Sequence, residues 1–260
     1  MRRSLRTLRH DGPIAYDGDR PLINFAGNDY LGLAQHPSLT HAVAEAVREH
    51  GFGSGASRLV TGNHPLHVAV EQRFAQFKHA EGGVLCPTGF MANLAAVSAL
   101  VGKGDLIAAD KLCHASMIDA ARASGATVRT YAHLDLARLE RLLERGHADV
   151  AQARQQRRIM IMTDSVFSMD GDVADLPGLR ELADRYGAIL YVDEAHGTGV
   201  LGETGGGLAE AQGVAGRVDV TVSTASKALG GLGGIITAQR EVVETIINRG
   251  RSFIYTTAAP

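Results

Sequence analysis

Short apolar runs alternate with helix-like segments along the chain, and this alternation limits the possible folds more than any other feature. The runs cover residues 83–86, 106–109, 127–131, 159–162, 189–192, 218–222 and 234–238. None shows the strict apolar–polar alternation of a strand with one wet face, so each is typical of a strand buried on both sides. We therefore expect an α/β fold with a mostly parallel central sheet and helices on both faces.

The segments between these runs supply the expected helices. They cover residues 39–50, 66–77, 90–101, 115–124, 134–143, 179–186 and 241–247, and the Gln- and Arg-rich stretch 146–157 is expected to be a solvated loop. In an open parallel sheet, ligands bind beyond the carboxyl ends of the strands. Residues that directly follow the strands are therefore the candidates for chemistry.

Composition excludes several classes of function. The 260 residues carry a formal net charge of -2, which gives no reason to expect a nucleic-acid partner. No apolar run approaches the roughly 18 residues that a membrane span needs. The cysteines Cys86 and Cys113 form no CxxC pair, so we expect neither a disulfide framework nor a zinc or other metal site. Reduced thiols of this kind are typical of a cytoplasmic protein.

The N-terminal stretch 1–9 holds four arginines and no acidic residue. It can be a transit peptide, which is usually longer, or a structural or substrate-facing basic segment. We treat residues 1–38 as an N-terminal segment and residues 39–260 as one large domain.

Lys227 is the only charged side chain between Val220 and Gln239. Small neutral residues surround it, and burial among them would lower its pKa and give a nucleophilic amine suited to Schiff-base chemistry. A surface lysine on a loop of small residues is an equally good interpretation of this segment alone.

Asp193 directly follows the strand 189–192, and Glu194 and His196 come next. Two acids and a histidine can form a metal site or a helix cap. Together with Lys227, a third interpretation is better. A carboxylate that pairs with a protonated pyridine nitrogen lets pyridoxal phosphate act as an electron sink, while a lysine holds the aldehyde of the cofactor as an imine.

A phosphate group needs backbone donors, and residues 87–93 follow a strand and open a helix, which favours an anion there. Hydroxyls at other strand ends, Ser168 and Thr224, are candidates to complete this site. Residues 87–93 can also be an ordinary tight turn that binds no phosphate. His114 precedes a helix and can either cap it or stack on a flat cofactor ring.

Competing motifs lack their context. Residues 51–56 satisfy the dinucleotide pattern G-x-G-x-x-A but follow a helix, whereas the pattern requires a preceding strand. The chain has no P-loop, GxSxG or HExxH motif.

Six ordered segments resemble the α-oxoamine synthases, pyridoxal-phosphate enzymes that join an amino acid to an acyl thioester with loss of carbon dioxide. The segments are residues 28–33, 53–62, 110–116, 166–172, 192–199 and 224–228. The resemblance implies the large domain of a pyridoxal-phosphate transferase. Members of the family are homodimers and continue into a small C-terminal domain, which supplies an arginine for the substrate carboxylate. We expect that domain to be absent from this chain, either as a cut fragment or as a truncation.

The resemblance also implies roles for individual residues. Lys227 matches the Schiff-base lysine, Asp193 the partner of the pyridine nitrogen, His114 the histidine stacked on the ring and His196 the one that bonds the phenolic oxygen. The matching cofactor and phosphate positions are Gly89, Phe90, Ser168 and Thr224, and the matching substrate-side positions are Arg2, Asn28 and His114.

Within the family, residues 57–62 and 196–199 favour the branch that condenses L-alanine with a pimeloyl thioester of coenzyme A or of a carrier protein in biotin synthesis. Branches that make 5-aminolevulinate or 2-amino-3-oxobutyrate more often have His-Ala-Val-Gly at the second site. There are two alternatives. The chain can be another enzyme on the same cofactor scaffold, such as an aminotransferase or a lyase, or a truncated non-catalytic chain.

Overall fold

The computed structural model describes residues 4–152 and 157–260 of the chain. Its main sheet has seven strands in the order β4-β10-β9-β8-β7-β5-β6. These strands are β4 (Gly82–Cys86), β5 (Leu106–Asp110), β6 (Thr127–Tyr131), β7 (Ile159–Asp164), β8 (Ile189–Asp193), β9 (Val220–Thr224) and β10 (Gly234–Ala238). Only β10 runs antiparallel to its neighbours β4 and β9, which confirms the expected mostly parallel sheet.

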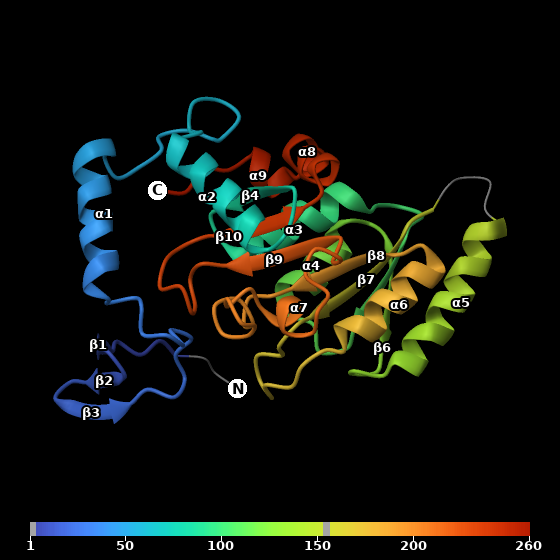
Figure 1. The fold of residues 1–260 in the computed structure, drawn as a ribbon, viewed down its shortest axis with the longest axis horizontal. Helices are drawn as coiled ribbons and strands as arrows, with labels where there is room; N and C mark the ends of the chain where they lie inside the picture. The colour runs from blue at the N-terminus through green and yellow to red at the C-terminus, as the bar shows by residue number, and fades with distance from the viewer. Residues whose placement is uncertain (1–3, 153–156) are drawn as a thin grey trace.

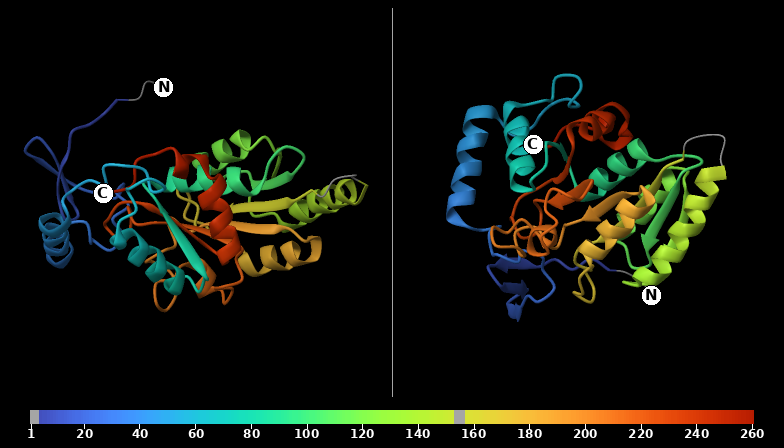
Figure 2. Two further views of the ribbon diagram at one scale, coloured as in Figure 1. Left: turned by 90° about the horizontal axis from the view of Figure 1, so that it is seen from above. Right: turned by 45° about the vertical axis from the view of Figure 1, so that its right-hand side comes forward.

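Helices cover both faces of this sheet, as Figures 1 and 2 show. One apolar cluster joins one face of the sheet to α3 (Gly89–Leu100), α4 (Ala115–Ala123), α8 (Arg240–Arg249) and α9 (Arg251–Ile254). On the other face, a second cluster includes α5 (Leu136–Gln152), α6 (Leu176–Tyr186) and α7 (Leu208–Ala211), and a third includes α2 (Pro65–Phe77). The inner strands β7, β9 and β10 are buried apolar runs because both of their faces lie under helices, whereas the edge strand β6 is largely exposed.

The N-terminal part lies to one side of the main sheet (Figure 1). It holds a small antiparallel sheet of β1 (Arg9–Asp11), β2 (Ile14–Asp17) and β3 (Arg20–Ile23), followed by α1 (Pro37–His50). The sequence did not predict β1 to β3, since these short strands are largely exposed and form no apolar run.

The predicted loop at 146–157 is partly wrong, because α5 continues to Gln152. A Cβ atom at Gly146 would overlap the side chain of Leu106. The helix therefore uses glycine there to approach β5 closely, and a glycine in this role resembles a helix end when only the sequence is seen.

The parallel strands end at one edge of the sheet. Consequently the segments after β4, β5, β7, β8 and β9 all begin at this carboxyl edge. These segments carry most of the residues that the sequence singled out, which is why the fold positions a site there.

Candidate active site

Lys227 lies in the loop that follows β9 and is half-buried. Its Nζ atom lies 3.0 Å from Nε2 of His196. Desolvation by burial lowers the pKa of Lys227, while the nearby carboxylates of Asp193 and Asp164 act in the opposite direction. The net lowering increases the share of neutral amine at a given pH, as a nucleophile or base requires.

Asp193 is the last residue of β8 and is only 5% exposed. Its Oδ1 accepts a hydrogen bond of 2.9 Å from the backbone N–H of Ala195, and its Oδ2 accepts one of 2.8 Å from Nδ2 of Asn93. The two donors hold both oxygens of this carboxyl group in place at the end of the strand, where a carboxylate can pair with a protonated ring nitrogen.

Asp164 ends β7 and stands opposite Asp193 in the register of the two parallel strands. Burial, and next the charge of Asp193, raise the pKa of Asp164 to about 8. One of its oxygens accepts a hydrogen bond of 2.9 Å from the backbone N–H of His114. The site therefore has two neighbouring carboxyl groups in different environments.

His114 lies between β5 and α4 and caps the helix, as one of the two sequence interpretations expected. Its Nδ1 lies 2.7 Å from Oγ of Ser116 and accepts a longer hydrogen bond of 3.3 Å from the backbone N–H of Ser116. The residue is exposed, so its ring is available to a ligand as well as to the helix. Capping and ring stacking are therefore compatible roles for this histidine.

His196 connects the lysine to the N-terminal part of the chain. Its Nδ1 lies 2.6 Å from the hydroxyl of Tyr30, which also donates to Oδ1 of Asn28 at 3.2 Å. Desolvation, and next the charge of Lys227, lower the pKa of His196 to about 4. The imidazole is thus neutral near pH 7 and can donate or accept a hydrogen bond at the site.

The turn between β4 and α3 has the geometry expected for an anion site. Thr88 caps α3 by accepting a 3.2 Å hydrogen bond from the N–H of Met91, and Gly89 and Phe90 form the first turn. A Cβ atom on Gly89 would lie 3.8 Å from Cβ of Thr224, so the helix begins beside the end of β9. A helix N-terminus next to a hydroxyl suits a phosphate group.

These groups fit a pyridoxal-phosphate cofactor in their chemistry. A half-buried amine, a buried carboxyl group and a helix N-terminus all lie at one edge of the sheet, as the three ends of that cofactor require.

Two of the predicted residues are placed differently from the rest. Ser168 lies in an exposed turn after β7, and within the described residues no hydrogen bond joins it to the other predicted site residues. Arg2 lies outside the described residues. Their roles stay predictions.

The sequence reasoning missed four polar residues that contact the predicted ones: Tyr30, Asn93, Ser116 and Asp164. Asp164 was within reach of the same argument as Asp193, because it lies two residues after the apolar run 159–162 and Asp193 directly follows the run 189–192. Nothing local distinguishes Asn93 from an ordinary polar residue on a helix, since its partner Asp193 is 100 positions away.

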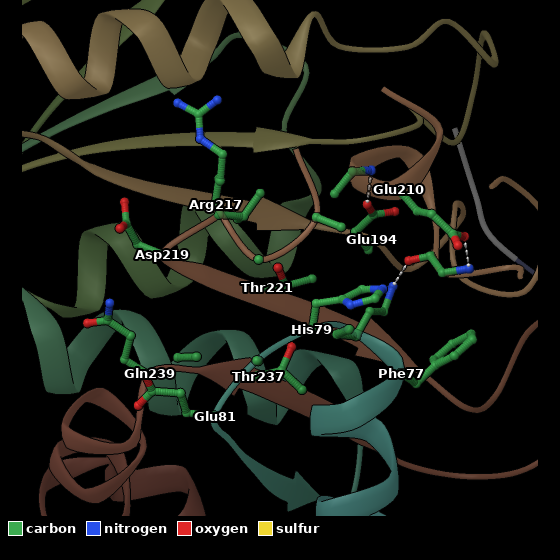
Figure 3. A pocket seen from close by; sticks show the side chains of 18 of the residues that line it. Phe77, His79, Glu81, Glu194, Glu210, Arg217, Asp219, Thr221, Thr237 and Gln239 are labelled. Atoms are coloured by element: carbon green, nitrogen blue, oxygen red, sulfur yellow. Dashed lines mark hydrogen bonds between the residues drawn. The ribbon is translucent and has the colours of Figure 1, made fainter. Parts of the chain in front are cut away.

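A separate pocket of about 350 Å³ lies over β9 and β10, between the turn after α2 and helices α6 and α7. Figure 3 shows the hydroxyls of Thr221 and Thr237 on its floor and the side chains of His79, Glu81 and Arg217 around it. None of the predicted site residues lines this pocket.

Within residues 4–152 and 157–260 there is no cluster of three or more potential metal ligands among His, Cys, Asp and Glu. No helix in this part of the chain is long and apolar enough to cross a membrane.

Comparison with known sequences gives the family. Residues 20–260 match the family model described as aminotransferase class I and II. An 8-amino-7-oxononanoate synthase from Geobacter sulfurreducens is 49% identical over 259 residues, which are 99% of this chain and 64% of that protein. One from Thermoanaerobacter pseudethanolicus is 44% identical over 96% of this chain and 62% of its own length. The chain thus spans less than two thirds of these relatives.

Solved structures give the same result. A serine palmitoyltransferase from S. paucimobilis with a bound PLP–myriocin aldimine superposes with a TM-score of 0.90 at 29% identity, covering 98% of this chain and 63% of that one. The 8-amino-7-oxononanoate synthase from Francisella tularensis superposes with a TM-score of 0.74 at 33% identity, covering 91% and 64%. This chain therefore belongs to the class I and II aminotransferase family and, within it, to the α-oxoamine synthases.

Proposed function

We propose that this chain carries the cofactor site of an 8-amino-7-oxononanoate synthase. In the proposed reaction, L-alanine condenses with the pimeloyl thioester of coenzyme A or a carrier protein, and the products are 8-amino-7-oxononanoate, the free thiol and carbon dioxide. The supporting observation is the juxtaposition of Lys227 and His196 at 3.0 Å beside the buried carboxylate of Asp193. The identity of 44–49% to synthases of this name supports the choice of substrates.

When bound, pyridoxal phosphate supplies an electron sink for charge that develops at the α-carbon of the amino acid. Lys227 would hold the cofactor and then, as a neutral amine, take the proton from that carbon. Asp193 would pair with the protonated ring nitrogen, and two donors hold its carboxyl group in position for this contact. His196 would bond the phenolic oxygen, and His114 would stack on the ring.

The remaining predicted residues complete the proposed site. Gly89, Phe90, Thr224 and Ser168 are the phosphate and cofactor positions, and Asn28, His114 and Arg2 the substrate side. We propose that residues 39–260 form the cofactor-binding large domain and residues 1–38 a separate N-terminal segment. The buried free thiols of Cys86 and Cys113 support a cytoplasmic location.

We also propose that the protein acts as a homodimer. The apolar face of α1, formed by Leu39, Val43, Ala46 and Val47, supports this, because no residue of the helix is buried within the described chain. Such a face needs a partner to leave water.

Covalent attachment at Lys227 is the first test. The protein reconstituted with pyridoxal phosphate is expected to show the visible absorption band of a lysine-linked cofactor. Lys227→Ala should abolish this band, whereas Lys103→Ala, which removes an exposed lysine, should keep it. An unchanged band in Lys227→Ala excludes that residue from the role.

Turnover separates the proposed reaction from its alternatives. Release of free thiol from pimeloyl thioester should depend on alanine. The similarity to a serine palmitoyltransferase makes serine with a long-chain acyl thioester the second candidate pair. Thiol release with that pair alone would replace the proposed substrates, and transamination without thiol release would exclude both condensations.

A further inference from the structure

Asn93 sits at the centre of a buried hydrogen-bond network beneath the site. It lies on α3, is 1% exposed and has all of its side-chain hydrogen-bonding groups engaged. Its Nδ2 donates to Oδ2 of Asp193 and to Oγ of Ser116, each at 2.8 Å, and its Oδ1 accepts from the hydroxyl of Tyr191 at 2.6 Å. Because the hydroxyl of Tyr191 donates to Oδ1, the amide nitrogen faces Asp193 and Ser116, and this fixes the orientation of the amide.

The directions of the hydrogen bonds in this network determine the tautomer of the His114 imidazole. The backbone N–H of Ser116 can only donate, so Nδ1 of His114, at 3.3 Å, has to accept. Because Nδ1 accepts from this N–H, it carries no proton, so the hydroxyl of Ser116, whose Oγ accepts from Nδ2 of Asn93, donates to the same Nδ1 at 2.7 Å. With both donors on Nδ1, the proton of a neutral imidazole lies on Nε2.

We propose that Asn93 and Ser116 are positioning residues: through the Asn93 amide and the Ser116 hydroxyl they join the carboxylate of Asp193 to the imidazole of His114 and hold His114 as the Nε2–H tautomer. The inference about Asn93 toward the cofactor rests on the proposed function, in which Asp193 and His114 contact opposite parts of the same ring system. The tautomer of His114 is a property of the protein without the cofactor.

The arrangement has two consequences for the site. The Asn93 amide holds Oδ2 of Asp193 at a fixed position, so the carboxylate meets a ring nitrogen without first reorienting. His114 is an exposed residue, and its Nε2–H remains as a hydrogen-bond donor for a carboxylate or carbonyl oxygen of the substrate. The Asn93 amide thus aligns both Asp193 and His114, the two residues proposed to contact the cofactor ring.

The first test is ¹⁵N NMR of the cofactor-free protein, with the His114 resonances assigned from His114→Gln. In the wild type, Nδ1 is expected to be unprotonated and hydrogen-bonded and Nε2 protonated. Ser116→Ala should move the Nδ1 resonance toward that of a more weakly hydrogen-bonded unprotonated nitrogen, because only the backbone N–H at 3.3 Å remains as a donor, and Ser116→Thr should restore it. Ser98→Ala, a matched hydroxyl deletion on α3, should leave it unchanged. A merely structural role would lower stability without moving this resonance.

The second test is the affinity for pyridoxal phosphate, measured by titration of variants whose folding circular dichroism has confirmed. Asn93→Leu removes a hydrogen bond to a charged group and should raise the Kd on the order of tenfold to hundredfold. Asn248→Leu, an exposed amide on α8, should not change it.

The outcomes separate this inference from the proposed function. A protonated Nδ1 in the wild type, or an Nδ1 resonance that Ser116→Ala leaves in place, overturns the positioning role, and both are read without the cofactor. An unchanged Kd in a folded Asn93→Leu variant also overturns it. A wild-type protein that binds no pyridoxal phosphate contradicts the proposed function instead.

Discussion

Asp164 and Asp193 illustrate how two carboxyl groups at neighbouring strand ends acquire different properties. Asp193 accepts two hydrogen bonds, whereas Asp164 accepts one, from the backbone N–H of His114. Burial, and next the charge of Asp193, raise the pKa of Asp164 from 3.8 to about 8. The folded protein thus keeps a proton on Asp164 at pH values where the unfolded chain has released it.

This difference predicts the effect of Asp164→Asn on the pH dependence of stability. The folded state binds more protons than the unfolded state between pH 3.8 and about 8, so the free energy of unfolding falls as pH rises through this window. Asparagine at position 164 cannot ionise, and its side-chain oxygen can still accept the hydrogen bond from the backbone N–H of His114. The variant should gain at least about 1.4 kcal/mol relative to wild type between pH 5 and pH 9, the equivalent of one pKa unit.

Urea unfolding of the cofactor-free protein at a series of pH values measures this gain. Asp119→Asn, on the exposed side of α4, is the control. Parallel pH profiles for wild type and Asp164→Asn would show that Asp164 is ionised in the folded protein throughout.

At the scale of elements, the start of α3 depends on its close approach to β10. A Cβ atom on Gly234 would lie 2.5 Å from both Cα of Gly89 and the carbonyl oxygen of Thr88. Real Cβ atoms do not approach so closely, and the obstructing atoms are backbone rather than flexible side chain. Glycine at 234 therefore holds the N-terminus of α3 against the sheet, next to the end of β9.

Gly234→Ala is accordingly expected to displace the first turn of α3. The free energy of unfolding should fall by about 1–3 kcal/mol, the usual cost of overpacking. The affinity for pyridoxal phosphate should fall as well, because the helix N–H groups move away from the phosphate position. Gly231→Ala is the matched control, since its Cβ atom would meet nothing closer than 3.5 Å.

Thermal unfolding and cofactor titration of both variants measure these effects. If Gly234→Ala loses stability but binds the cofactor like wild type, the start of α3 is not part of the phosphate site.

At the scale of the whole molecule, α1 is the helix least integrated into the described chain. Its apolar residues recur at helical spacing on one face, yet Val43 is 54% and Val47 40% exposed. Figure 1 shows α1 to one side of the main sheet rather than on one of its faces. The large domain is therefore expected to fold without this face, while assembly depends on it.

Val43→Asp combined with Val47→Asp should consequently dissociate the proposed homodimer and leave the fold around the main sheet intact. Sedimentation velocity measures the dissociation and circular dichroism the fold. His41→Asp with Ala44→Asp adds the same two acidic residues off that face of α1 and should leave the dimer in place. A double variant at 43 and 47 that sediments like wild type would exclude this face as the interface.

The sequence by itself determined the sheet and the principal candidates. The apolar runs at 189–192 and 234–238 fall on β8 and β10, because strands buried under two helical layers have to be continuous apolar runs. Lys227 and Asp193 were found because residues after such runs meet at one edge. The exposed strands β1 to β3 and the short helices α7 and α9 were not predicted, since elements of three or four residues leave no periodic pattern.

Only the tertiary structure decided which side chains meet at that edge. His196 lies 166 positions from Tyr30, and Asn93 lies 100 from Asp193. Hydrogen bonds across such separations depend on how the layers stack and on a distance tolerance of a few tenths of an ångström. Local pattern carries information about burial and periodicity, whereas the partner of a buried amide or imidazole is set by packing between distant segments.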